Sequence, residues 1–276
     1  MHPSPVLSPA AQAFDAVAAS FDERYGRWRS VAAQRRAVRL ALLHAFSPGA
    51  RVIEIGGGTG EDALWLARRG RDVLMTDASP AMVGIAGRKL RESRRSRAEE
   101  VPAEALESFA RSGVGEFDGG FSNFAALNCV SDITGVARGL ACLLRPEAPL
   151  LLVLFGPLPP GEVAVQLARG DVRAAFRRLA RGEVPARLGG RDFAVWYHRP
   201  REIDHAFAPW FRMVSRRGVG VFVPPSAAEP WISGHPGFLR GLEWMDRKAA
   251  RPLALLGDHI LYSFRRTAAP PPDTSE

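Results

Sequence analysis

The segment from Arg51 to Gly60, with the sequence RVIEIGGGTG, constrains the fold of this chain more than any other. An apolar β-type stretch with an acid near its end runs into a glycine-rich turn, and a helical pattern follows over 61–69. Glycine tolerates positive φ and has no Cβ, so the backbone of such a turn can approach a ligand closely. The first N–H groups of the next helix are free to bind that ligand. The segment therefore predicts either a nucleotide-cofactor loop or a simple tight turn between a strand and a helix.

The next strand favours the cofactor loop. A dinucleotide loop has the spacing Gly-x-Gly-x-x-Gly, whereas the sixth position counted from Gly56 is Glu61. The stretch RDVLMTD ends in Asp77, about 20 residues after the turn, where an acid is placed to accept hydrogen bonds from both hydroxyls of a ribose. The competing role for Asp77 is a helix cap, but Ser79 already supplies one, with Pro80 at the first helical position. We therefore expect a nucleoside cofactor that is not a dinucleotide.

Strand and helix patterns alternate along the chain, which favours an α/β fold with a parallel, doubly wound sheet. After the fifth strand the sequence predicts an insertion of one or two arginine-rich helices and a short strand. The expected elements are a helical region at 11–46, a weakly marked third strand at 98–102, a fifth strand at 149–155, inserted helices within 157–190, a short strand at 193–197, a helix at 200–207, a sixth strand at 211–223, a helix at 237–250 and a seventh strand at 259–265.

These patterns divide the chain into three parts. Residues 1–46 form a tail and a helical lid, residues 47–267 form the main domain with a substrate lid at about 157–200, and residues 268–276 form a disordered tail. Residues 1–10 hold three prolines and are also expected to be disordered.

Four motifs between residue 47 and about residue 156 resemble those of class I S-adenosylmethionine-dependent methyltransferases, particularly the small-molecule branch related to ubiquinone and menaquinone methyltransferases. They are VIEIGGGTG at 52–60, VLMTDASPAM at 73–82, FDGGFSNFAALN at 117–128 and LLRP at 143–146. The first two are specific at this spacing, and the last two are supportive. The resemblance implies a Rossmann-like sheet of seven strands with the last strand antiparallel. It also implies S-adenosyl-L-methionine as cofactor and S-adenosyl-L-homocysteine as product.

By this resemblance the cofactor is held by the N-terminal helix, the glycine loop and the loops after the second and fourth strands. The residues expected to contact it are Tyr25, Glu54, Gly56, Gly57, Gly58, Gly60, Asp77, Ala78, Met82, Ser122 and Asn123. Gly56 and Gly58 are expected to face its methionine part, and Glu54 its ammonium. Met82 either covers the adenine or belongs to the core. The adenine-edge loop is expected near Ala103 and Glu104.

The acceptor is expected under a lid made of the N-terminal aromatic helix and the insertion. The residues expected to line its site are Phe21, Phe124, Asn128, Trp196 and Trp231. Asn128 has the alternative role of capping the turn that follows it. Four histidines are candidates for a general base, namely His198, His205, His235 and His259. His198 is favoured because it lies in the insertion, and His235 comes next.

A methyl sulfonium is already activated, so such an enzyme mainly aligns donor and acceptor and excludes water. We expect a small, aromatic or apolar acceptor, methylated at oxygen or carbon. The Asn/Asp-Pro-Pro-Tyr motif of amino-group methylators is replaced by Ser-Asn-Phe-Ala at 122–125, which makes a macromolecule methyltransferase the weaker alternative. The other alternative is a regulatory protein that binds the cofactor without turnover, and the intact glycines and Asp77 argue against it. The sequence decides neither the acceptor nor the oligomeric state.

The net charge of +8 invites a nucleic-acid partner, but only two of the 37 basic residues are lysines. Such an arginine bias is typical of an effect of genome base composition rather than of selection for phosphate contacts, and the basic clusters lie beside acids. We therefore expect solvated faces and no nucleic acid, with docking to an anionic substrate or a membrane as the alternative. No apolar run reaches the ~18 residues of a membrane span, so no stable membrane insertion is expected.

The N-terminus lacks a signal pattern, which favours a cytoplasmic location. Cys129 and Cys142 lack the spacing of metal ligands and are expected to be free thiols, without a metal site.

Overall fold

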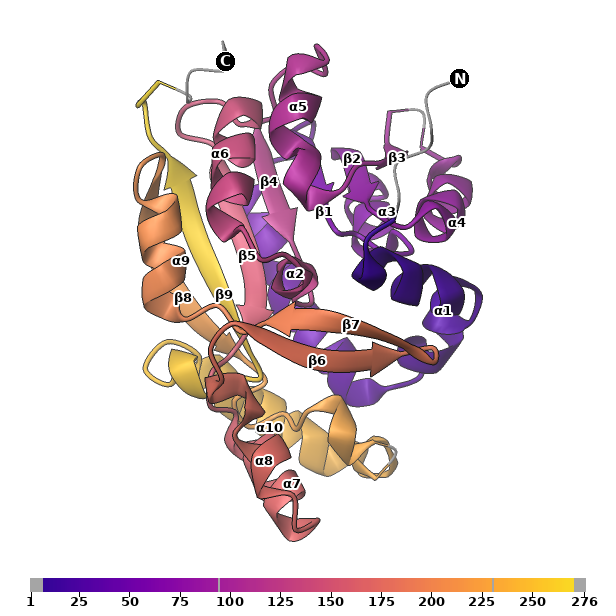
Figure 1. Cartoon of the computed structure of the whole chain (residues 1–276), viewed down its shortest axis with the longest axis vertical. Helices are drawn as coiled ribbons and strands as arrows, with labels where there is room; N and C mark the ends of the chain where they lie inside the picture. The colour runs from indigo at the N-terminus through magenta and orange to yellow at the C-terminus, as the bar shows by residue number, and fades with distance from the viewer. Residues whose placement is uncertain (1–6, 94, 230, 271–276) are drawn as a thin grey trace.

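The computed structural model describes residues 7–93, 95–229 and 231–270. A single seven-stranded sheet runs through it in the order β3-β2-β1-β4-β5-β9-β8 (Figure 1). The strands are β1 (Arg51–Ile55), β2 (Asp72–Asp77), β3 (Arg97–Glu100), β4 (Gly119–Ser122), β5 (Pro149–Phe155), β8 (Phe211–Val219) and β9 (His259–Arg266). β1 to β5 are parallel, and β9 pairs antiparallel with both β5 and β8. The predicted Rossmann-like, doubly wound sheet with an antiparallel last strand is therefore confirmed.

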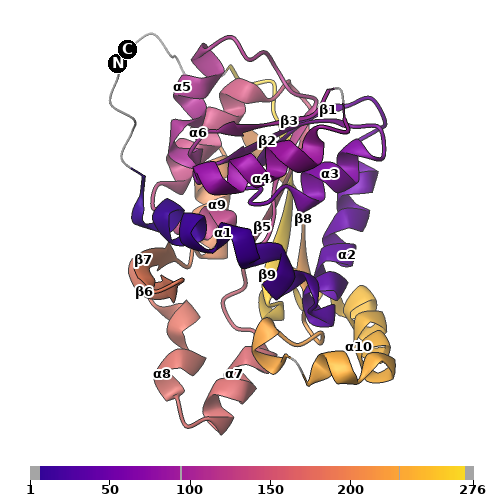
Figure 2. The ribbon, with the colours of Figure 1, turned by 90° about the vertical axis from the view of Figure 1, so that its right-hand side faces the viewer.

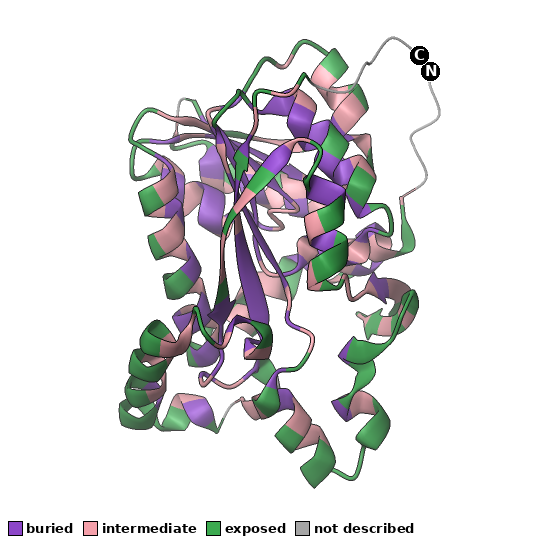
Figure 3. Cartoon of the chain, turned by 90° about the vertical axis from the view of Figure 1, so that its left-hand side faces the viewer, coloured by how far each residue is buried: buried purple, intermediate pink, exposed green. Residues whose placement is uncertain are grey.

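Helices cover both faces of this sheet (Figure 2). On one face lie α5 (Leu106–Arg111), α6 (Ile133–Leu143) and α9 (Pro200–Phe207), and on the other lie α2 (Arg29–Ala45), α3 (Glu61–Ala67) and α4 (Pro80–Leu90). Central strands are apolar on both sides for this reason, as β5 shows: Leu150 and Leu152 pack on the first face, and Leu151 and Val153 on the second. The five inner strands are accordingly buried almost throughout, whereas the edge strands β3 and β8 and the outer faces of the helices are largely exposed or half-buried (Figure 3).

The N-terminal helical region consists of two helices, α1 (Pro9–Gly26) and α2. α1 begins before residue 11, because Ser8 Oγ accepts a hydrogen bond from Ala11 N (3.2 Å) and Pro9 occupies the first turn. The expectation of disorder over 1–10 is therefore wrong for residues 9 and 10. The rest of the expected tails falls largely on residues 1–6 and 271–276, which lie outside the described residues.

The insertion after β5 differs from its prediction in one element. It contains α7 (Pro160–Ala168), the short α8 (Val172–Ala175) and the 3-10 turn η3 (Arg177–Leu179). Residues expected to be helical then form β6 (Glu183–Leu188), which pairs antiparallel with β7 (Arg191–Trp196) in a separate hairpin. β6 lacks an apolar run and includes Pro185, so its sequence gives no strand signal. The strand forms because the segment pairs with β7. Beyond the insertion, β8 ends at Val219 rather than at 223.

The remaining segments complete the edge of the sheet. They are η1 (Ala103–Ala105), η2 (Ala126–Cys129), η4 (Ser226–Ala228), η5 (Ile232–Gly234), α10 (Pro236–Ala249) and η6 (Ala254–Leu256). The weakly marked third strand is confirmed as β3. No helix in the described ranges is both long and apolar enough to cross a bilayer.

Candidate active site

A cavity of about 590 Å³ lies at the carboxyl end of the parallel strands, where the strand order reverses between β1 and β4. Open α/β sheets bind ligands at this position. Its first half is lined by the glycine turn, the end of β2, α1 and η1. Its second half is lined by η2, the end of β5, the start of β9 and the insertion. The cavity thus joins two differently built half-sites.

The glycines of the turn have different roles. A Cβ on Gly56 would lie 2.4 Å from the Cβ of Ala126, one on Gly57 would lie 2.4 Å from the Met75 side chain, and one on Gly60 would lie 2.8 Å from the Cβ of Ala86. These three positions need glycine for packing. A Cβ on Gly58 would meet nothing within 4 Å, although its φ is +56°. Gly56, Gly57 and Gly58 line the cavity and Gly60 does not, so Gly58 is the glycine whose missing side chain leaves room for a ligand.

Asp77 fixes the glycine turn while facing the cavity. Its Oδ2 accepts a hydrogen bond from Gly58 N (2.8 Å), and its Oδ1 accepts one from Ser79 N (2.9 Å). Burial raises the pKa of Asp77, and these backbone hydrogen bonds lower it by less. Ser79 Oγ accepts a hydrogen bond from Met82 N (3.1 Å), so Ser79 caps α4 as the sequence predicts. Asp77 is therefore not needed as a cap.

Glu54 and Arg35 are two residues of opposite charge type at the side of the cavity. Glu54 is 2% exposed, and its Oε2 has no hydrogen-bond partner in the described structure. Burial and the neighbouring Asp62 raise its pKa, against smaller effects of Arg35 and Arg39. The Arg35 guanidinium lies over the Phe124 ring at 5.0 Å, and its buried Nε has no hydrogen-bond partner, although it lies 3.9 Å from Asp62 Oδ1. A buried acceptor and a buried donor that both lack a hydrogen bond suit a ligand that carries a cationic and an anionic group.

The loop after β4 is held in an uncommon conformation. Phe124 and Ala125 have φ values of +47° and +60°, which non-glycine residues seldom adopt. Asn123 supports them, because its Oδ1 accepts a hydrogen bond from Phe124 N (2.8 Å) and its Nδ2 donates to Asp62 Oδ2 (2.7 Å). Asn123 and Phe124 line the cavity. Ser122 is buried and is not part of the lining.

Helix α1 lies across the first half of the cavity. The sequence Phe-Asp occurs twice at a spacing of seven residues, and its aromatic and acidic residues make different contacts. Phe14 and Phe21 line the cavity. Asp15 accepts hydrogen bonds from Ser79 Oγ and Ala81 N (2.8 Å each), and Asp22 accepts one from Thr59 Oγ1 (2.5 Å) and pairs with Lys89 (2.6 Å). The repeat therefore places two aromatic rings over the cavity and two carboxylates against the domain. Tyr25 completes the lining from this helix.

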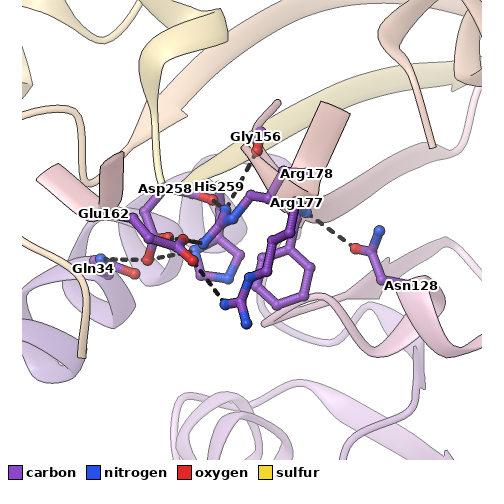
Figure 4. A network of polar contacts seen from close by, with 9 residues as sticks. Gln34, Asn128, Gly156, Glu162, Arg177, Arg178, Asp258 and His259 are labelled. Carbon is purple, nitrogen blue, oxygen red and sulfur yellow. Dashed lines mark hydrogen bonds and ion pairs between the residues drawn. The ribbon is translucent and has the colours of Figure 1, made fainter. Parts of the chain in front are cut away.

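A buried polar network closes the second half of the cavity (Figure 4). Arg178 of η3 donates to the main-chain oxygen of Asp258 (2.6 Å), to Asp258 Oδ1 (2.7 Å) and to Gly156 O (3.3 Å), and it pairs with Glu162. The side chains of Arg178, Glu162 and Asp258 are 6%, 5% and 8% exposed. Burial by itself would raise the pKa of Asp258, but His259, Arg178 and the hydrogen bonds from Arg178 and Gln34 lower it. The network joins the insertion to the ends of β5 and β9.

His259 stands at the centre of this half. Its ring stacks on Phe155 at 5.1 Å and meets the edge of Phe124 at 5.8 Å. Its Nδ1 lies 3.4 Å from Asp258 Oδ2. Burial lowers the pKa of His259, which keeps the imidazole neutral and able to accept a proton. Tyr197 lines the cavity beside Phe155, with the two ring centroids 5.7 Å apart.

Several residues predicted for the acceptor lie elsewhere. Trp196 and His198 do not line the cavity. The main-chain oxygen of Trp196 accepts a hydrogen bond from Asn128 Nδ2 (2.6 Å), and His198 Nε2 bonds to Val130 O (2.9 Å), so both serve to dock the β6–β7 hairpin. Trp231 is 59% exposed, and its ring contacts that of the exposed His235, with the two centroids 4.8 Å apart, outside the cavity. The inward orientation expected for Trp196, His198 and Trp231 is therefore wrong, and neither His198 nor His235 is placed to be a base.

Apart from Gly60 and Ser122, the other residues predicted to bind the cofactor or the acceptor line the cavity. These are Tyr25, Glu54, Gly56, Gly57, Gly58, Asp77, Ala78, Met82, Asn123, Phe21, Phe124 and Asn128, together with the expected edge residues Ala103 and Glu104. The amide of Asn128 also joins η2 to the sheet, because its Oδ1 accepts a hydrogen bond from Phe155 N (3.0 Å). Both cysteines are free, as predicted. Within the described ranges no group of three or more His, Cys, Asp or Glu side chains is placed to hold a metal ion.

Comparison with known proteins agrees with this geometry. Residues 52–147 match the family model described as a methyltransferase domain. A ubiquinone biosynthesis O-methyltransferase of Xanthomonas campestris pv. campestris is 31% identical over 123 residues, which are 45% of this chain and 48% of that protein. The protein of the same description from Xanthomonas oryzae pv. oryzae is 31% identical over 153 residues, 51% of this chain and 62% of that protein. The chain thus spans 48% and 62% of the length of these two relatives.

Solved structures share the fold at low identity. An S-adenosylmethionine-dependent methyltransferase from Listeria monocytogenes superposes with a TM-score of 0.58 and 16% identity, over 86% of this chain and 98% of that one. The [4+2]-cyclase SpnF superposes with a TM-score of 0.62 and 15% identity, over 95% and 98% of the two chains. Because one of these neighbours is described as a cyclase, the structural likeness establishes the fold and does not identify the reaction. The reaction has to be inferred from the residues of the site.

Proposed function

We propose that the chain is a class I S-adenosylmethionine-dependent methyltransferase and that it methylates a small acceptor held in the second half of the cavity. The observation that carries the proposal is the unpaired buried Glu54 carboxylate in a cavity that also holds the open Gly58 and Asp77. Each of these features suits one part of S-adenosyl-L-methionine.

The first half of the cavity fits this cofactor. The Glu54 carboxylate is suited to its ammonium, and the Arg35 guanidinium to its carboxylate. Asp77 is suited to the ribose, because each carboxylate oxygen can accept a second hydrogen bond besides the one from the backbone. The cofactor supplies an activated methyl group when it is bound. The chain's own contribution is to hold the two reactants in line and to keep water away beneath α1.

The second half suits an aromatic or apolar acceptor. Phe155, Phe193, Val195 and Tyr197 supply apolar contact area, and His259 supplies a neutral base among them. We assign to His259 the removal of a proton from a hydroxyl or an acidic carbon of the acceptor. Asp258 acts through His259, since its carboxylate lies beside Nδ1 and stabilises the charge that the imidazole gains.

Binding of S-adenosyl-L-homocysteine tests the cofactor half. In isothermal titration calorimetry Asp77→Ala is expected to lose about 2–4 kcal/mol, from the ~1.5–3 kcal/mol range of hydrogen bonds to charged groups. Glu54→Gln keeps the shape and removes the charge, and we expect about tenfold weaker binding, since ~1.4 kcal/mol separates charged from neutral partners. The control is Asp72→Ala at the opposite end of β2, whose side chain does not line the cavity. Unchanged affinity in both site variants would exclude the cofactor assignment.

Transfer of a labelled methyl group to phenols, catechols and hydroxyquinones tests the acceptor half. With the best acceptor, His259→Gln is expected to lower kcat by about 10²–10⁴-fold, the usual contribution of a general base. Its affinity for S-adenosyl-L-homocysteine should stay within about threefold, or ~0.7 kcal/mol. His198→Gln is the matched control and should keep its activity. Equal losses in both variants would remove the role of His259.

A further inference from the structure

Exposed hydrophobic side chains gather at one end of the molecule. Twelve large hydrophobic residues are exposed among those the structure describes, and ten of them come from two segments, 157–182 and 231–256. The ten are Leu158, Leu167, Val172, Phe176, Leu179, Trp231, Phe238, Trp244, Met245 and Leu255. Both segments lie beyond the lower end of the sheet in Figures 1 and 2, where α7, α8 and α10 are labelled. We call these two segments together the α7–α10 end.

Helix α10 is amphipathic, but its outer face is not simply polar. Leu239 is 3% exposed and packs inward against Ile232 and its neighbours. Phe238 and Trp244 are each 56% exposed on the outside, and Trp231 adds a third exposed aromatic ring, 6.2 Å from that of Phe238. Isolated exposed hydrophobic residues are common, whereas contiguous aromatic groups on a monomer usually mark a binding surface.

Exposed cations lie on the same helix as Phe238 and Trp244 and directly after it. Arg240, Arg247, Lys248 and Arg251 are exposed, and the described structure gives none of them an ion pair. Across the α7–α10 end, nine Arg and Lys residues stand against four Asp and Glu residues, which concentrates much of the net charge of +8 here. Aromatic rings among unpaired Arg and Lys side chains are typical of a surface that lies at the boundary between lipid headgroups and acyl chains.

We propose that the α7–α10 end docks peripherally on an anionic lipid bilayer, with Trp231, Phe238 and Trp244 entering the interface and the surrounding Arg and Lys residues pairing with lipid phosphates. The surface charge decides for a bilayer over a second copy of the chain, because two copies meeting here would oppose like charges. The bound form lies on the bilayer, since no described helix could span it.

The α7–α10 end lies next to the second half of the cavity, which relates docking to catalysis. This step rests on the proposed function. Gln166 and Arg177 line the second half of the cavity and belong to the α7–η3 segment of the insertion. The acceptor half therefore lies under an element of the docking end. An apolar acceptor dissolved in the membrane would reach it with little passage through water.

Flotation of the full chain with vesicles tests the docking. The chain is expected to float with vesicles of phosphatidylcholine and phosphatidylglycerol, and weakly with phosphatidylcholine alone, and added salt should weaken the binding. The double variant Phe238→Asp/Trp244→Asp should reduce the partition coefficient by more than about tenfold, because each buried aromatic side chain accounts for roughly tenfold. Val214→Asp is the matched control: this side chain is 54% exposed on β8, outside the α7–α10 end.

Charge reversal tests the electrostatic contribution to bilayer binding separately from the contribution of the aromatic side chains. Arg240→Glu/Arg247→Glu/Lys248→Glu should abolish the preference for phosphatidylglycerol, and circular dichroism should show every variant folded. The proposal is overturned if the chain floats with neither vesicle, if the control variant loses as much binding as the aromatic one, or if the aromatic variant dissociates a dimer seen by analytical ultracentrifugation. Binding of S-adenosyl-L-homocysteine should be unchanged in these variants. Failure of docking is therefore distinct from failure of the proposed methyl transfer.

Discussion

Replacing Arg178 by Met removes the charge that joins the insertion to the sheet while keeping most of the side-chain length. Two carboxylates then stay buried, those of Glu162 and Asp258, at 5% and 8% exposure. The main-chain oxygens of Gly156 and Asp258 also lose their Arg178 donor. Removing one partner of a buried ion pair destabilises a protein by about 3–5 kcal/mol. Glu162 keeps its contact with Arg177 at 2.7 Å, so we expect the lower end of that range.

Thermal denaturation followed by circular dichroism measures this effect. A loss of about 3 kcal/mol corresponds to a fall in Tm of roughly 6–12 °C for a chain of this size. The control is Arg187→Met, because Arg187 and Asp192 form an ion pair that is 70% and 78% exposed and is worth at most about 1 kcal/mol. Equal changes in Tm for the two variants would refute the assignment of Arg178 as the anchor.

The pH dependence of this loss has a definite sign. In the native chain the pKa of Asp258 is lowered, so its contribution to stability is present above the ordinary carboxyl value and is lost as the pH falls through the native pKa. Without Arg178 the pKa of Asp258 should rise, because the charge and the hydrogen bond of Arg178 no longer lower it while burial still raises it, and its ionised form then contributes less to stability. The difference in Tm between the native chain and Arg178→Met should therefore narrow as the pH falls toward the carboxyl range. A difference that widens on acidification would contradict this electrostatic account.

Four further outcomes follow from individual residues. Gly58→Ala should fold, because nothing lies within 4 Å of the added Cβ, and should bind S-adenosyl-L-homocysteine at least about tenfold more weakly by calorimetry, because the Cβ would occupy space left for the ligand. Gly57→Ala should instead lose stability in thermal denaturation, because its Cβ would lie 2.4 Å from the Met75 side chain in the core. The acid limb of the methyl-transfer rate should lie below pH 6.5, because burial lowers the pKa of His259, and a limb above this value would argue against a buried base. Cys129, whose pKa burial raises to about 12, should stay unmodified by a disulfide reagent at neutral pH until the chain unfolds. Asp22→Ala should speed proteolysis within α1, since the helix loses two contacts to the domain, and unchanged cleavage would mean that other contacts hold it.

The lining of the first half of the cavity could be predicted from the sequence because its signals are local. Glu54, the glycines and Asp77 belong to two consecutive strand–turn–helix units, and Ser79 with Pro80 fixes the start of α4 within a few residues. Each signal depends on short-range backbone geometry, which a sequence pattern carries directly.

The lining of the second half of the cavity could not be predicted in this way because its parts are brought together only by the tertiary fold. Arg178 and Asp258 are 80 residues apart in sequence, and neither stands in a local pattern that marks a site. His259 was one of four histidine candidates, and what distinguishes it is the direction of β9. Since β9 is antiparallel to β5, its first residue pairs with Phe155 at the ligand edge. Trp231 and His235 show the opposite error: their ring types suit a pocket, but the helix after them packs its Leu239 side inward and leaves them outside.

The attachment of the insertion has an evolutionary consequence. The stretch from 157 to 197 leaves the sheet after β5, rejoins it before α9, and is fastened by the Arg178–Asp258 contacts and the bond from Asn128 to the main chain of Trp196. Neither fastening involves the glycine turn or Asp77. On the proposed function, a paralogue could therefore replace the sequence of this stretch, keep one arginine, and acquire a new acceptor preference while the glycine turn and Asp77 stay unchanged.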